Sequence, residues 1–181
     1  MTTSTENLIN ELIDLTQEHL AFAESLLLKT DAELNKRLTD ESWSVLECLE
    51  HLNLYGNFYL PEIKNRIETS TTKATTEFKS GWLGNYFAQS MLPKEKLNKM
   101  KAFKSMNPIH SSLSKNTVMV FIDQQKQLLD LLNASRNVNL SKVKTSISIT
   151  TLIKLKLGDT FRFIIYHNKR HVVQAQKVLA N

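Results

Sequence analysis

A chain of 181 residues is long enough to bury a sizeable core without help from disulfides, and we expect one domain over residues 1–181. It has 41% hydrophobic and 23% charged residues, as globular proteins do, and a net charge of +5 that comes largely from lysines. Its four glycines and three prolines are too few for a loop-rich β-sandwich or barrel, so the composition favours an all-α protein with long helices.

The first predicted helix covers residues 5–29. Its apolar residues recur at helical spacing and are Leu8, Leu12, Leu15, Phe22 and Leu26. His19 lies on the same stripe, so we expect it to face the core, where a lone histidine is usually a hydrogen-bonded polar group. The alternative is that His19 lines a pocket or supports a metal ligand.

The second predicted helix begins at Ser44. Ser44 and Glu47 form a capping box, in which each side chain accepts a hydrogen bond from the backbone N–H of the other residue. Trp43 before the cap and Cys48 inside the helix fit the hydrophobic staple that often accompanies such a box.

Pro61 is expected to bend this helix or to break it before its end near Thr69. The connection that follows, residues 70–114, is long, and we expect it to hold one or two short helices. Three aromatic residues within it are expected to pack back on the bundle, with a lid over a pocket as the alternative. They are Trp82, Tyr86 and Phe87.

The third and fourth helices are predicted over residues 116–135 and 158–180. The connection between them contains a β-prone stretch, residues 146–150, that can be extended. Asp159 stands in the first turn of the fourth helix, where a negative charge suits the helix dipole. Long connections after the second and third helices, with four long helices in all, predict a four-helix bundle.

Five lysines cluster in the connection 70–114, and they are Lys94, Lys96, Lys99, Lys101 and Lys104. A basic patch can attract phosphates. No recognised nucleic-acid motif accompanies the cluster, and a solvated lysine face explains it equally well, so we expect no nucleic-acid partner.

Cys48 is the only cysteine, which excludes an internal disulfide and a cysteine-based metal site. The polar N-terminus carries an acid before any apolar run, unlike a signal peptide. No apolar stretch approaches the roughly 20 residues of a membrane span. We therefore expect a cytoplasmic protein with no membrane partner.

His167 and His171 are four residues apart, so on a helix they share one face and can present two ring nitrogens to one point. His51, in another helix, can complete a three-histidine site for a divalent transition metal with an open coordination position. The alternative is three unrelated histidines that are buried and hydrogen-bonded, or exposed.

Two segments resemble the signature regions of the DinB-like superfamily, namely residues 43–52 around His51 and residues 157–175 around His167 and His171. The resemblance implies a single four-helix-bundle domain whose three histidines bind a divalent metal, commonly zinc or nickel. It also implies an activity within a family that includes thiol S-transferases, such as the bacillithiol transferases, and many proteins of unassigned activity.

A histidine ligand normally donates its second N–H to a carboxylate, a carbonyl or a water. Glu47 and Tyr55 lie one turn either side of His51 and can serve as partners or line the pocket, although the capping box is the preferred role of Glu47. The other residues considered near the site are interpreted as surface or packing residues, and they are His110, Arg170 and Gln174.

These observations support two hypotheses for function. The first is a metal-dependent enzyme that acts on a small molecule, either a thiol S-transferase using a low-molecular-weight thiol or a hydrolase; its catalytic residues beyond the ligands are unknown. The second is a non-catalytic metal-binding or stress-related bundle protein, including one that forms a homodimer and has lost its activity.

Overall fold

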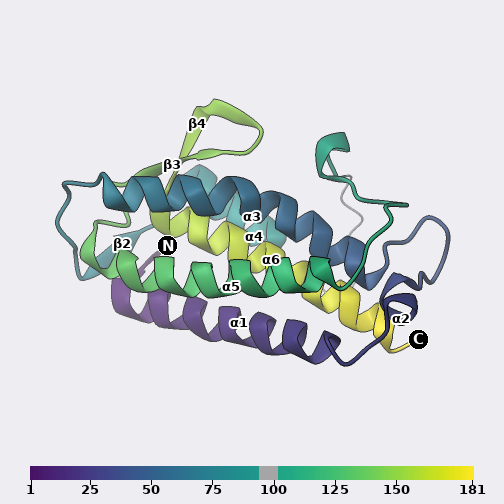
Figure 1. The fold of residues 1–181 in the computed structure, drawn as a ribbon. Coiled ribbons are helices and arrows are strands. Elements are labelled where there is room, and N and C mark those ends of the chain that lie inside the picture. The colour runs from purple at the N-terminus through teal and green to yellow at the C-terminus, as the bar shows by residue number, and fades with distance from the viewer. Residues whose placement is uncertain (94–101) are drawn as a thin grey trace.

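The computed structural model describes residues 1–93 and 102–181, and in these ranges four long helices form a bundle (Figure 1). They are α1 (Thr5–Leu26), α3 (Val45–Glu68), α5 (Asn116–Ala134) and α6 (Leu157–Leu179). α1 and α3 each pack against both α5 and α6, so α1 and α3 occupy opposite corners of the bundle. The predicted all-α fold is confirmed, and so are the long connections after α3 and α5.

Two of the long helices begin at a serine cap, and the cap of α3 is the predicted one. Ser44 caps α3, and the reciprocal hydrogen bonds of the box join its side chain and backbone to Glu47. Ser4 caps α1, which begins at Thr5 as predicted but ends at Leu26. Caps of this kind satisfy backbone N–H groups that have no partner within the helix.

Pro61 does not break α3, which continues unbroken to Glu68. Proline removes a backbone donor and usually disrupts a helix at this point. Here the residues around it, Tyr59, Leu60 and Ile63, are buried in the core of the bundle. We attribute the continuity of α3 to this tertiary packing, which outweighs one missing hydrogen bond.

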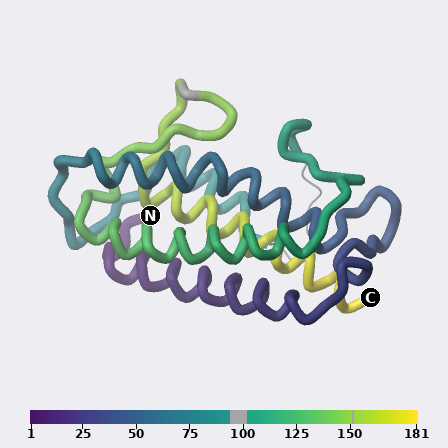
Figure 2. Tube along the Cα trace, viewed as in Figure 1, coloured from purple at the N-terminus to yellow at the C-terminus, as the bar shows by residue number. Residues whose placement is uncertain are grey.

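The connection after α3 contains β2 (Glu77–Lys79), α4 (Trp82–Met91) and the short 3-10 helix η1 (Lys104–Met106). β2 pairs antiparallel with the N-terminal β1 (Thr2–Ser4), in the register Thr3 opposite Phe78. The predicted lysine cluster falls mostly on residues 94–101, which lie outside the described ranges, while Lys104 is exposed. The end of α3 and the start of α5 lie at opposite ends of the bundle, and η1 lies beside α3 (Figure 2).

The prediction that the aromatic residues of α4 pack back on the bundle is wrong for two of them. Trp82 and Tyr86 are 85% and 62% exposed, while Phe87 is half-buried. α4 packs on α6 through a different face, formed by Gly84, Ala88 and Met91. Only one face of a helix can pack inward, and Gly84 determines which face it is, because a Cβ at this position would lie 2.5 Å from the Asp159 carboxylate.

Between α1 and α3 the chain forms a short helix, α2 (Asp31–Asn35). After α5 come the 3-10 helix η2 (Ser135–Asn137) and an antiparallel hairpin of β3 (Lys144–Ile147) and β4 (Thr150–Lys156). The β-prone stretch 146–150 covers the end of β3, the turn and the first residue of β4. The rest of β4 was not predicted.

The core consists of two apolar clusters with a polar layer between them. Members of the first include Leu12, Tyr59, Leu128 and Ile164. Members of the second include Ala23, Leu49, Phe121 and Val172. On each long helix buried polar residues stand between the two sets, and they include Thr16, His19, Asn53, Gln124, Gln125 and Asn168. Hydrogen bonds from Asn168 to Gln125 and from Gln124 to the Asn53 carbonyl join three of the helices in this layer.

No helix in the described part of the chain is both long enough and apolar enough to cross a membrane.

Candidate metal centre

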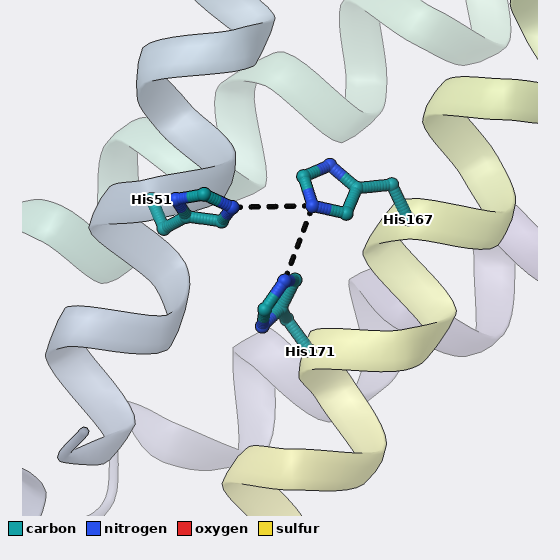
Figure 3. A group of neighbouring side chains, drawn as sticks. All are labelled: His51, His167 and His171. Carbon is teal, nitrogen blue, oxygen red and sulfur yellow. Dashed lines mark hydrogen bonds between the residues drawn. The ribbon is translucent and has the colours of Figure 1, made fainter. Parts of the chain in front are cut away.

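Three histidines from two helices converge on one point between α3 and α6 (Figure 3). His51 Nε2 and His171 Nε2 each lie 3.1 Å from His167 Nε2, and the three ligand atoms all lie within 4.8 Å of one another. The residues are buried, with 3%, 6% and 8% exposure for His51, His167 and His171. The structure thus brings together the three histidines that the sequence singled out.

The outer nitrogens of two of these rings define their tautomers. His51 Nδ1 lies 2.5 Å from the Met106 carbonyl oxygen, which can only accept, so Nδ1 carries the proton. His171 Nδ1 lies 3.0 Å from Gln174 Oε1 and is assigned the same way. In both rings Nε2 is left with a lone pair that faces the centre.

These lone pairs show that the donor set fits a metal ion. His51 and His171 both direct a lone pair at His167 Nε2, and a single proton on that atom could satisfy only one of them. A cation that accepts a lone pair from each ring would satisfy all three. Zn–N bonds of about 2.0–2.1 Å in a tetrahedron separate neighbouring ligand nitrogens by about 3.3 Å, close to the two observed distances.

Burial keeps these histidines neutral, which is the form that binds metal. It lowers the pKa of His51, and it lowers the pKa of His171 to about 3 with a contribution from the nearby His51. For His167 burial comes first, followed by the charges of His171, His51 and Arg170, and its pKa is well below the ordinary value. At neutral pH the three imidazoles are therefore uncharged, so a metal ion does not have to displace a proton from an imidazolium to bind.

Aromatic rings pack around the three imidazoles. The Trp43 ring lies 4.7 Å from His51 and 5.5 Å from His171, between ring centroids. The Tyr55 ring lies 5.0 Å from His51 and 4.7 Å from His167. Tyr55 therefore lines the three-histidine group, which was one of its two predicted roles. Trp43 also packs against the imidazoles, a contact that the sequence did not reveal.

The Glu47 carboxylate forms its hydrogen bonds with groups other than the His51 imidazole. Its buried carboxylate accepts hydrogen bonds from the Ser44 backbone N–H at 2.8 Å, from Arg37 Nε at 2.9 Å and from the His110 backbone N–H at 2.5 Å. Burial alone would raise the pKa of Glu47, but these hydrogen bonds outweigh it and the pKa is lowered. The preferred role in the capping box is confirmed, and the contacts to Arg37 and His110 add a tertiary role.

Like Trp43, the site residues Gln174 and Met106 were not identified from the sequence. Gln174 was interpreted as a surface or packing residue, although its spacing of three from His171 on one helix is a signal for contact. Met106 contributes only its backbone carbonyl, so its side-chain type carries no signal. His110 is exposed, as predicted for a surface residue.

His19 is buried in the polar layer and does not belong to the three-histidine group. Neither of its ring nitrogens has a hydrogen-bond partner among the described residues, contrary to the expected satisfied core histidine. Burial, followed by the positive charge of Lys169, lowers its pKa to about 3. His19 therefore stays neutral in the folded protein.

We expect His19→Leu to make folding less sensitive to acid. Below its ordinary pKa of 6.5 His19 binds a proton only in the unfolded chain, so the free energy of unfolding falls by about 1.4 kcal/mol per pH unit as the pH drops towards 3. Leucine removes this contribution. Urea unfolding of metal-free protein between pH 7 and pH 5 should show a shallower pH slope for His19→Leu than for the exposed control His110→Leu, and equal slopes would contradict the prediction.

The fold and the three-histidine group together define a helical bundle with a candidate mononuclear metal centre on two of its helices. The sequence model of the DinB superfamily matches residues 11–175, and the chain belongs to this superfamily. No curated protein and no solved structure was found to match the chain.

Proposed function

We propose that the chain is a metal-dependent enzyme that transfers a low-molecular-weight thiol to a small electrophile, with Zn²⁺ or Ni²⁺ on His51, His167 and His171. The observation that carries this proposal is a convergent donor set of three. Across residues 1–93 and 102–181, no cysteine or carboxylate joins these histidines. Three protein ligands leave a tetrahedral ion one position for a further ligand, as in catalytic zinc sites.

The chain's own residues provide the ligands and the surroundings of this position. The Met106 carbonyl and the Gln174 amide keep two rings in the ligating tautomer, and Trp43 and Tyr55 shield the imidazoles from water. A bound Zn²⁺ or Ni²⁺ would lower the pKa of a thiol at the open position and keep it as the thiolate at neutral pH. In the transfer, sulfur bonds to the electrophilic carbon, the leaving group departs with its electron pair, and the thiol proton goes to solvent.

The surroundings of the histidines favour thiol transfer over hydrolysis. Metal-dependent hydrolases commonly enlist a carboxylate or histidine as a general base beside the ion. The described residues place aromatic rings, a backbone carbonyl and a neutral amide against the three imidazoles, and no carboxylate or further histidine of these residues joins the group. A thiolate is already a nucleophile and needs no such base.

A non-catalytic metal-binding protein is the second candidate. The burial of all three histidines, each less than a tenth exposed, favours it because a substrate must reach the metal to react. The two candidates agree on the ligands and differ in whether a small molecule reaches the fourth position.

A thiol-transfer assay tests the proposal. Metal-loaded protein without a histidine tag would be incubated with several small thiols and monobromobimane, whose thioether products fluoresce. We expect faster thioether formation with at least one thiol, and loss of that acceleration after chelation, while circular dichroism shows that the apo protein keeps its helices because the apolar clusters do not depend on the metal. Bound metal with no acceleration for any thiol would favour the non-catalytic candidate.

A further inference from the structure

The segment Met106–His110 contacts the candidate metal centre at its start and Glu47 at its end. Near its start the Met106 carbonyl receives the hydrogen bond from His51, and Asn107 Oδ1 accepts one from Trp43 Nε1 at 3.1 Å. At its end the His110 backbone N–H donates to Glu47. The segment therefore holds a ligand ring and the aromatic ring packed against it.

Glu47 anchors this segment to α3. Its side chain is fully buried, and Arg37 binds both carboxylate oxygens, Nη2 at 2.5 Å and Nε at 2.9 Å. Arg37 Nη1 also lies 3.0 Å from His110 Nδ1. The ion pair therefore contacts the His110 backbone through Glu47 and the His110 side chain through Arg37. Since Glu47 and His51 are one turn apart on α3, the anchor and the ligand share a rigid element.

The backbone of His110 indicates that the anchor holds a strained conformation. His110 has φ of 65°, and it is the only described residue other than glycine with a positive φ. A left-handed conformation costs a residue with a Cβ on the order of 1 kcal/mol and persists where surrounding contacts impose it. Without the hydrogen bond to Glu47, the segment could relax and carry the Met106 carbonyl away from His51.

We propose that Glu47 is a positioning residue of the metal centre: through His110 it fixes the segment whose Met106 carbonyl holds His51 with its Nε2 lone pair directed at the metal. This inference rests on the proposed metal centre and explains how a carboxylate that does not touch His51 controls it. It assigns Arg37 the supporting role of keeping the carboxylate charged and oriented. Hydrogen-bonded partners behind a ligand typically change metal affinity by about 10–100-fold when removed.

Glu62 supplies a matched control. It lies on the same helix and accepts a hydrogen bond from Arg66 Nε at 2.9 Å. It also accepts one at 2.7 Å from the backbone N–H of Ser146, which lies in the connection between α5 and α6. It thus resembles Glu47 in partner types but anchors the β3–β4 hairpin instead of the segment next to His51. Glu62→Ala should weaken folding without moving the metal ligands.

The first measurement is the Zn²⁺ dissociation constant by chelator competition. We expect Glu47→Ala to bind Zn²⁺ about 10–100-fold more weakly than the wild type, Glu47→Gln to lie between them because it keeps one acceptor oxygen, and Glu62→Ala to bind as the wild type does. Glu47→Gln preserves the shape of the side chain, so it tests the proposal even if Glu47→Ala does not fold. Equal affinities for both Glu47 variants and Glu62→Ala would overturn it.

The second measurement needs no metal. Nitrogen-15 chemical shifts of the apo protein report which nitrogen of His51 carries the proton, and we expect Nδ1–H in the wild type and in Glu62→Ala, with a mixture of tautomers in the Glu47 variants. An unchanged tautomer in the Glu47 variants would overturn the positioning role. A wild-type protein that binds no Zn²⁺ would refute the proposed function while leaving this tautomer test intact.

Discussion

Replacing His167 by alanine is expected to abolish stable metal binding. His167 Nε2 is the atom nearest to both other ligand nitrogens, at 3.1 Å from each, so its loss leaves two donors that no longer surround an ion. Structural zinc sites with four ligands bind with roughly 10–16 kcal/mol, or about 3 kcal/mol for each ligand, which corresponds to more than about 100-fold in affinity. We expect about one equivalent of metal per chain in the wild type and only a trace in His167→Ala.

Elemental analysis after dialysis of protein purified without a histidine tag measures this occupancy. His171→Ala should behave as His167→Ala does, because it removes another member of the group. His19→Ala is the matched control, because His19 is also buried in the bundle but does not belong to the three-histidine group. Equal metal content in all of these variants would show that the metal binds elsewhere.

Asp159→Ala is expected to cause the largest loss of folding stability, about 3–5 kcal/mol. Asp159 and Arg162 are fully buried and form an ion pair, with Arg162 Nη1 at 3.1 Å from the carboxylate. Asp159 also accepts hydrogen bonds from the backbone of Gly81, at 2.7 Å, and from Ser80 Oγ. Without the carboxylate the guanidinium is a buried, uncompensated charge, and its Nε already has no partner among the described residues.

Urea unfolding monitored by circular dichroism measures this loss, which is a large fraction of the 5–15 kcal/mol that typically stabilise a domain. The control is Glu6→Ala, because Glu6 pairs with Arg136 at the surface and such pairs contribute about 0–1 kcal/mol. If Asp159→Ala lost no more stability than Glu6→Ala, the buried pair would not be the link between α4 and α6 that its contacts indicate.

Local signals predicted the helices well because they depend on residues close in the chain. The capping box of Ser44 and Glu47 placed the start of α3 correctly, and the spacing of His167 and His171 placed two rings on one face of α6. Pro61 shows the limit of such reasoning. Its local tendency to break a helix is opposed by buried neighbours whose packing partners are on other helices.

The sequence alone determined the class of fold and the residue types of the candidate metal centre, because apolar periodicity and histidine spacing are properties of single helices. The tertiary structure decided what surrounds the histidines: the Met106 carbonyl, the Trp43 ring and the anchoring of the segment by Glu47. It also decided that Trp82 and Tyr86 face solvent, since the small Gly84 lets the opposite face of α4 approach Asp159. These features join residues far apart in sequence, so they depend on how the helices and connections pack, and no local pattern records that arrangement.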